Sequence, residues 1–247
     1  MARGAHSCVR IKNEGTPLRE ESVRVAVIDS GWDYQSTANV RVLPGQNFSG
    51  TQDSSAQDSH GHGTECVLLI AAVAPSVTFL PIKVFAESLT TSVTALLKGL
   101  DWAVEQDVDV INLSLGSDEP SAIGPLQEIC TRAERKGALV VAASDPTGRW
   151  NYPASFESVI SVDNGDFAKP YEFSYAVDNV PECRVGPRLV RTRSMGGVER
   201  IRSGSSYAAA QLSGIAAIFR QSHSNAGTDQ FRRFLASSQS VNQRGVP

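Results

Sequence analysis

VRVAVIDSG, residues 23–31, is an apolar run, interrupted only by Arg24, that stops at a carboxylate, Asp29, two residues before a glycine. Runs of the same kind recur at VTFLPIKVF (77–85), VDVINLSL (108–115) and ALVVAAS (138–144). Strands as apolar as these are buried on both faces, which is typical of parallel sheets. We therefore predict that these runs form the strands of one mainly parallel sheet.

Amphipathic segments separate the apolar runs. The first, residues 91–106, places apolar residues at helical spacing, namely Val93, Leu96, Leu97, Leu100 and Val104. A second, PLQEICTRAERKG (125–137), ends on Gly137, a common residue at the end of a helix. Because strands alternate with helices, we predict an α/β fold with helices on both faces of the sheet. Residues 164–205 are rich in turn residues, and we assign them no element.

The composition is that of an ordinary globular domain. Of the 247 residues, 41% are hydrophobic and 20% are charged, which suffices for the core of one large domain. The net charge of -3 gives no overall attraction for nucleic acid or for an anionic membrane. We therefore expect neither as a partner.

The N-terminal segment MARGAHSCVRIKNEGTPLREE lacks the apolar core of a secretory signal, and no later run reaches the roughly 18 apolar residues of a membrane span. These features favour a cytoplasmic protein, with residues 1–21 as an N-terminal extension of flexible character and residues 22–247 as one domain. The cysteines form no CxxC pair, which favours free thiols over disulfides or a zinc site: Cys8, Cys66, Cys130 and Cys183.

Three short stretches carry residues that are suited to catalysis together. VAVIDSGWD places Asp29 at the end of a strand, DSHGHGTECV places His62 before an apolar helix, and RSGSSYAAAQLSG places Ser206 at the start of another helix. A serine hydroxyl needs a base to take its proton, and the base needs a carboxylate to orient it. The helix start adds N–H donors where negative charge develops. Ligands of open α/β sheets bind beyond the carboxyl ends of the strands, which is where Asp29, Ser114 and Asp145 fall.

The chain order Asp, His, Ser is the order found in subtilisins. Several motifs also resemble landmarks of the subtilisin-like serine proteases across residues 22–222: VIDSG, GHGTEC, INLSLG, VVAAS, YPASFESVISV and GSSYAAA. The resemblance implies peptide-bond hydrolysis on a parallel sheet between helices, with Asp29 as orienting acid, His62 as base and Ser206 as nucleophile. It also implies substrate-binding positions that pair with the substrate backbone or wall its first specificity pocket: Ser114, Leu115, Gly116, Ala143 and Ser144.

The metal and cofactor expectations depart from those of many subtilisins. The helix after His62 runs to the next strand without the calcium-binding insertion that many relatives carry, so we expect no metal and no cofactor. His60, His62 and Cys66 offer an alternative, because this spacing could ligate a transition metal. Cys66 itself is either a small buried hydrophobic residue or the cysteine that thiol-containing and kexin-like members carry near the histidine.

Asp145 is the sharpest departure from the family pattern. Where the family has Ala-Ala-Gly-Asn, with the asparagine amide donating to the oxyanion, this chain has AASD. An ionised carboxylate offers only acceptors, whereas a protonated one can donate a hydrogen bond. We therefore expect Asp145 to face the oxyanion in its protonated form. The alternative is that it caps its loop, with Asn151 or backbone N–H groups filling the oxyanion hole.

The sequence thus predicts a serine endopeptidase that acts through an acyl-enzyme on a polypeptide, with a dedicated precursor peptide as the expected substrate. One alternative is a transpeptidase or macrocyclase that uses the same acyl-enzyme. Another is a catalytically dead homologue that only binds peptides, an alternative raised by Asp145. Arginines before Ser206 could bind an acidic substrate, although a solvated hairpin face explains them more simply: Arg184, Arg188, Arg191, Arg193, Arg200 and Arg202.

Overall fold

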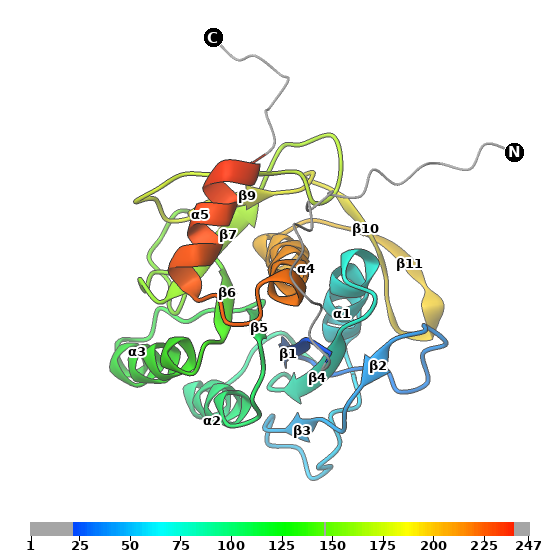
Figure 1. Ribbon diagram of the computed structural model, residues 1–247. Coiled ribbons are helices and arrows are strands. Elements are labelled where there is room, and N and C mark those ends of the chain that lie inside the picture. Colours follow the sequence, from blue (N-terminus) through cyan, green and yellow to red (C-terminus); the bar gives the residue numbers. More distant parts are fainter. Residues whose placement is uncertain (1–21, 146, 240–247) are drawn as a thin grey trace, which may run out of the picture.

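The computed structural model describes residues 22–145 and 147–239 (Figure 1). The extension predicted over residues 1–21, with Cys8, lies outside these ranges. Within them, a central sheet is enclosed by helices on both faces, and the prediction of an α/β fold with a mainly parallel sheet is confirmed.

The large sheet has the strand order β2-β4-β1-β5-β6-β7-β9-β8, with β3 paired to β4. All of its pairings are parallel except that of β8 with β9, and β10 and β11 form a separate antiparallel hairpin. The strands are β1 (Arg24–Asp29), β2 (Arg41–Val42), β3 (Gln46–Asn47), β4 (Thr78–Lys83), β5 (Val110–Leu113), β6 (Leu139–Ala143), β7 (Val159–Asn164), β8 (Phe173–Tyr175), β9 (Cys183–Val185), β10 (Val190–Arg193) and β11 (Glu199–Arg202).

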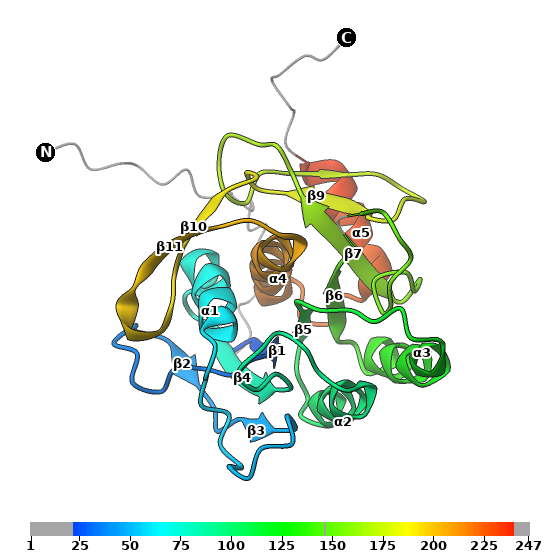
Figure 2. The same cartoon turned by 180° about the vertical axis from the view of Figure 1, so that it is seen from behind.

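The helices divide between the two faces of the sheet, as Figures 1 and 2 show from opposite sides. On one face lie α2 and α3, and on the other lie α1 and α4, with α5 beside the far strands. The helices are α1 (His62–Val73), α2 (Val93–Val104), α3 (Pro120–Arg135), α4 (Ser205–Ser222) and α5 (Thr228–Ser238), with a short 3-10 turn at Met195–Gly197.

Alternation along β1 explains why the middle of the strand, residues 25–28, is apolar at every position. Val25 and Val27 belong to the core formed with α1 and α4, whereas Ala26 and Ile28 belong to the core formed with α2 and α3. Successive side chains of a strand point to opposite faces, so a strand between two helical layers needs apolar residues at every position. The same alternation places Asp29, the residue after Ile28, at the carboxyl edge of the sheet.

Helix α3 begins at Pro120, five residues before the helical segment that the sequence predicts over residues 125–137. Pro120 occupies the first turn, where its fixed φ suits a helix start and its missing N–H costs no hydrogen bond. Pro125 lies inside the helix instead of starting it. The unassigned region 164–205 contains the end of β7, β8, β9 and the β10–β11 hairpin. These strands are short, which explains why turn residues dominate the sequence there.

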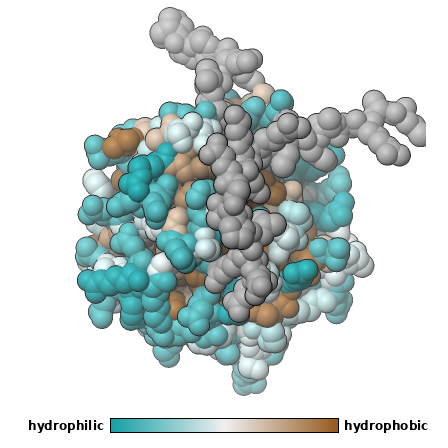
Figure 3. Space-filling model, viewed as in Figure 1, coloured by the Kyte–Doolittle hydropathy of each residue, from teal (hydrophilic) through white to brown (hydrophobic). Residues whose placement is uncertain are grey.

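The part of the surface visible in Figure 3 is mostly hydrophilic, with hydrophobic residues scattered over it. Large exposed hydrophobic residues include Trp150, Leu189 and Ile201. Among the residues that the structure describes, no helix combines the length and the apolar character needed to cross a membrane.

Candidate active site

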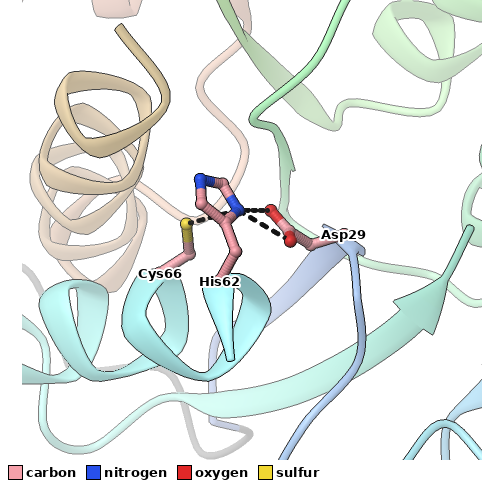
Figure 4. Close-up of side chains that lie close together, drawn as sticks. All are labelled: Asp29, His62 and Cys66. Carbon is pink, nitrogen blue, oxygen red and sulfur yellow. Dashed lines mark hydrogen bonds and ion pairs between the residues drawn. The ribbon is translucent and has the colours of Figure 1, made fainter. Parts of the chain in front are cut away.

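Asp29 and His62 form the most closely defined contact at the carboxyl edge of the sheet (Figure 4). Asp29 ends β1 and His62 begins α1, and both are buried. The Nδ1 atom of His62 lies 2.8 Å from Oδ1 and 2.8 Å from Oδ2 of Asp29. A histidine held in this way by a carboxylate has a fixed ring orientation, with Nδ1 as the protonated nitrogen and Nε2 directed elsewhere.

Two glycines allow these two residues to meet. A Cβ atom on Gly63 would lie 2.3 Å from the carbonyl oxygen of Gly31, so no side chain fits between α1 and the turn after β1. The hydroxyl of Ser30 accepts a 2.9 Å hydrogen bond from the N–H of Gly63 across the same contact. Gly63, in the first turn of α1, and Gly31, in the turn after β1, are therefore both required because the backbone segments approach so closely.

Asp58 fixes the start of α1, a role that the sequence reasoning missed. Its Oδ1 accepts from the N–H groups of His60 and Gly61, and its Oδ2 accepts from the N–H and hydroxyl of Thr64. Burial opposes ionisation of Asp58, but these hydrogen bonds outweigh it and lower the pKa of the carboxyl below its ordinary value. The N-cap preference for Asp does not single out this residue, because Gly61 is the N-cap of α1 and Asp58 lies three residues before it.

The electrostatic surroundings of His62 favour its protonated form. Burial of the ring opposes protonation, but the adjacent carboxylate of Asp29 outweighs it and raises the pKa of His62 well above its usual value of 6.5. An imidazole with a raised pKa is a stronger base when it is neutral. It is therefore suited to taking a proton from a hydroxyl group.

Ser206 lies in the first turn of α4, and its hydroxyl donates a 2.9 Å hydrogen bond to the carbonyl oxygen of Ser114. Its neighbour Tyr207 packs against the His62 ring, with 5.2 Å between the ring centroids. The structure thus brings together the Asp29–His62 pair and the start of α4. In this state the Ser206 hydroxyl bonds to Ser114 and not to the imidazole.

Cys66 lies beneath the imidazole, one turn further along α1. Its Sγ is 3.9 Å from Nδ1 of His62 and 3.4 Å from Oγ of Ser114. Burial raises the pKa of the Cys66 thiol, so the sulfur carries a proton at neutral pH. The cysteines among the described residues are free thiols, as the sequence predicted, and all of them are buried: Cys66, Cys130 and Cys183.

The only group among the described residues with three potential metal ligands close together consists of Asp29, His62 and Cys66, whose ligand atoms lie within 4.8 Å of one another. His60, the other histidine of the HxH pair, is not part of it. Because the Nδ1 of His62 already bonds to Asp29, a metal there would displace the catalytic hydrogen bond. This donor set therefore fits a hydrogen-bonded pair better than a resident metal.

The predicted substrate-binding positions lie at the ends of neighbouring strands. Residues 114–116 follow β5, and residues 143–144 end β6, which pairs with β5 in parallel. Asn151 lies between these two segments. Its Nδ2 donates to the carbonyl oxygen of Ala143 at 3.1 Å, and its Oδ1 accepts from the N–H of Asp145 at 3.0 Å.

Asn151 also contacts the opposite segment. A Cβ on Gly116 would lie 2.3 Å from Nδ2 of Asn151, so the amide reaches directly to that backbone. The space between the two segments is therefore occupied by the Asn151 side chain. Nothing in the local sequence signals this, because it depends on three segments that meet only in the fold.

Asp145 makes the contacts of a loop cap. Its Oδ1 accepts from both the N–H and the hydroxyl of Thr147, and Arg149 lies 3.4 Å from its Oδ2. The hydrogen bonds from Thr147, with a smaller contribution from Arg149, lower the pKa of Asp145 below its ordinary value. These observations oppose a protonated donor at neutral pH, and they match the alternative in which the carboxylate caps its own loop.

Comparison with known proteins shows similarity along most of the chain. The sequence model of the Peptidase_S8 family, described as the subtilase family, matches residues 20–246. The chain is 32% identical to M-protease of Shouchella clausii (strain KSM-K16) over 238 residues, which is 88% of this chain and 59% of that protein. It is also 32% identical over 238 residues to Subtilisin Savinase of Lederbergia lenta, covering 88% of this chain and 83% of that protein.

A solved lanthipeptide protease has the same fold, with a TM-score of 0.70 at 22% identity over 91% of this chain and 81% of the other. The chain spans less than two thirds of M-protease, but it covers most of Savinase and nearly all of the family model. On this evidence, together with the Asp-His-Ser order at one edge of the sheet, the chain belongs to the subtilase family of serine proteases.

Proposed function

We propose that this chain is a serine endopeptidase in which Ser206 is the nucleophile, His62 the general base and Asp29 the residue that orients His62. The observation that carries the proposal is the buried contact of His62 Nδ1 with both carboxylate oxygens of Asp29 at 2.8 Å. This contact leaves Nε2 as the nitrogen that accepts the serine proton. The packing of Tyr207 on the imidazole supports it, since it brings the start of α4 against His62.

The reaction begins when a substrate displaces the resting hydrogen bond of Ser206. We infer that a substrate N–H bonds to the carbonyl oxygen of Ser114, which the Ser206 hydroxyl contacts in the free protein. The released hydroxyl then gives its proton to Nε2 of His62 while its oxygen attacks the scissile carbonyl carbon. His62 passes that proton to the leaving amine, and water, activated by the same nitrogen, hydrolyses the ester.

Because the carboxylate of Asp145 accepts hydrogen bonds from Thr147, the developing oxyanion needs hydrogen-bond donors other than Asp145. The first N–H groups of a helix have no partner within the helix, and α4 begins at Ser205. We propose that the N–H of Ser206 and the positive end of the α4 dipole stabilise the oxyanion. Asp145 then has a structural role at this edge of the sheet, where its carboxylate holds the loop after β6 through Thr147.

The substrate-binding segments favour a narrow range of cleavage sites. We propose that residues 114–116 pair with the substrate backbone, and that Ala143 and Ser144 form the facing wall. Because the Asn151 amide spans the space between them, the first pocket accepts a small side chain. A restricted pocket suits a dedicated precursor peptide better than general digestion, and the lanthipeptide protease among the fold neighbours adds support for processing of this kind.

Two rivals remain distinct from this proposal. A macrocyclase would resolve the acyl-enzyme with an amine of the substrate, and a dead homologue would bind peptides without cleaving them. The hydrogen bond from the Ser206 hydroxyl to the carbonyl oxygen of Ser114 is compatible with a dead homologue, because it directs the hydroxyl away from the imidazole. The intact Asp29–His62 pair favours an active enzyme.

Mass spectrometry of a diverse peptide library tests all three functions. Hydrolysis adds the mass of one water to the combined products, whereas cyclisation gives a product that lacks any such addition. We expect water-containing cleavage products with the wild-type protein and none with Ser206→Ala. Cyclic products would support the macrocyclase, and an unchanged library with both proteins would support the binding module.

A further inference from the structure

Glu65 is a fully buried carboxylate that the proposed reaction does not use. It follows His62 on α1 by three residues, and its exposed fraction is 0%. An ionised carboxylate loses its hydration on burial, so it persists only where ion pairs and hydrogen bonds compensate. The partners of Glu65 come from two elements that are distant in the sequence.

Arg202, at the end of β11, binds Glu65 through two nitrogens. Its Nε lies 3.0 Å from Oε2 and its Nη2 lies 3.0 Å from Oε1, which is the paired geometry that a guanidinium forms with a carboxylate. Burial opposes ionisation of Glu65, but Arg202 and Tyr207 outweigh it and lower the pKa of the carboxyl. Glu65 is therefore a carboxylate anion held by its partners.

Tyr207 is the second partner and leads directly to the catalytic residues. Its hydroxyl donates a 2.9 Å hydrogen bond to Oε2 of Glu65. Its ring packs on the imidazole of His62, with 5.2 Å between centroids and 58° between planes. It also follows Ser206 in the chain. Tyr207 thus joins Glu65 to the base through its side chain and to the nucleophile through the backbone.

The β10–β11 hairpin completes the arrangement. It runs along the outer side of α1 in both Figures 1 and 2. At its tip, Ser194 lies over the residue before His62, since a Cβ on Gly61 would be 2.3 Å from Ser194 Oγ. The N–H of Gly196 donates to Asp33, in the loop after β1. Arg202 anchors the other strand of the hairpin through Glu65.

We propose that Glu65 is a positioning residue for catalysis: through the Tyr207 hydroxyl it holds the tyrosine ring against His62, and through Arg202 it fastens the β10–β11 hairpin beside the site. The Asp29 hydrogen bond fixes one edge of the imidazole, and the Tyr207 ring fixes one of its faces. The two contacts together leave the imidazole little freedom to tilt away from Ser206. This inference rests on the proposed function of His62 and Ser206.

Tyr207→Phe is the direct test, because it keeps the ring and removes only the bond to Glu65. Tyr171→Phe is the matched control, since the Tyr171 hydroxyl also bonds to α1, at the carbonyl oxygen of Leu69, and lies at the other end of that helix. The measurements are the rate of labelling of Ser206 by a fluorophosphonate and the NMR signal of the His62 Nδ1 proton. Urea unfolding of the same variants reports the stability change.

We expect Tyr207→Phe to slow labelling at least about tenfold, because a small displacement of a catalytic group is costly. Tyr207→Ala should slow it further, to about 10²-fold. The His62 Nδ1 proton signal should broaden in both, while Tyr171→Phe should change stability without changing either readout. If Tyr207→Phe does not fold, Arg202→Lys, which keeps the charge but loses the paired geometry, should give the same effects in weaker form.

Labelling and proton signals that match the wild type in these variants, with a stability loss like that of Tyr171→Phe, would overturn the inference and leave Glu65 a structural anchor. The proposed function would survive that result. Absence of labelling in the wild-type protein would instead contradict the proposed function itself. The two failures are therefore distinguishable.

Discussion

At the scale of single residues, the proposed mechanism makes the Asp29–His62 pair responsible for the pH dependence of cleavage. The anionic Asp29 raises the pKa of His62, and only neutral His62 acts as base. We therefore expect kcat/KM to fall with decreasing pH along a limb whose midpoint lies above the ordinary histidine value of 6.5. The pH profile of peptide cleavage measures this midpoint.

Asp29→Asn supplies the control for this pH limb. The substitution removes the negative charge that opposes the effect of burial, so the pKa of His62 falls. We expect kcat/KM to drop by about 10³ to 10⁴, as for a triad without its acid, and the midpoint to move to lower pH. A midpoint that stayed in place would show that Asp29 does not control the protonation of His62.

Asp145 yields a second prediction at this scale. As a loop cap, it needs only an acceptor for Thr147, which an asparagine also provides. We expect Asp145→Asn to keep kcat at neutral pH within about threefold of the wild type, since typical losses of an oxyanion donor are far larger, about 10² to 10³. A gain of that larger size at neutral pH would show instead that the side chain faces the oxyanion, as the sequence suggested.

At the scale of elements, we propose that the loop between β6 and β7 limits which side chain the first pocket accepts. Its Asn151 amide fills the space between the segments after β5 and β6. Asn151→Ala should open that space, so the kcat/KM ratio for Phe over Ala at the cleavage site should rise about tenfold or more. Matched peptide pairs measure the ratio, with Asn179→Ala on an exposed loop as control. An unchanged ratio would place the pocket elsewhere.

The elements that could be predicted were those with local signals. The strand from residue 23 to 29 was clear because residues 25–28 are all apolar, and the start of α1 because glycines surround His62. The arginines before Ser206 predicted a solvated hairpin face, and β10 and β11 do form a hairpin there, but the ion pair that one of these arginines makes was not predictable. One of them, Arg202, turns inward to Glu65, which lies 137 residues away in the chain. Partners so distant leave no local pattern.

The residues of the candidate site also fall into those with a local sequence signal and those without one. Asp29, His62 and Ser206 were identifiable because each stands at a strand end or helix start within a short motif. Asn151 was mentioned in the sequence reasoning only as an alternative oxyanion donor, and its place between two backbone segments depends on their approach in three dimensions. The carboxylate of Asp145 likewise turns toward Thr147 for reasons of loop geometry that residue type alone does not convey.

At the scale of the whole molecule, a buried ion pair ties the last long helix to the opposite edge of the sheet from the site. Arg220 of α4 donates to Asp109 at 3.0 Å, and Asp109 also accepts from the N–H of Arg24 at the start of β1. Both partners are buried. Removing Arg220 would take away the cation that pairs with the buried Asp109 carboxylate, and loss of one partner of a buried pair is strongly destabilising.

Arg220→Met should therefore destabilise the protein by about 3 to 5 kcal/mol. Urea unfolding measures the change, in a Ser206→Ala background that prevents self-digestion. Arg132→Met is the control, because its partner Asp101 is exposed, and it should cost at most about 1 kcal/mol. Equal losses in the two variants would show that the Arg220 pair does not stabilise the packing of α4.

The central claim for the molecule is that Ser206 is a nucleophile activated by His62. The most direct measurement is treatment of the native protein with a fluorophosphonate, followed by mass spectrometry of its peptides. The account predicts one adduct, on Ser206, that is absent from Ser206→Ala and strongly slowed in His62→Ala. A protein that forms no adduct, or that is labelled at another residue while Ser206 stays unmodified, would contradict the account.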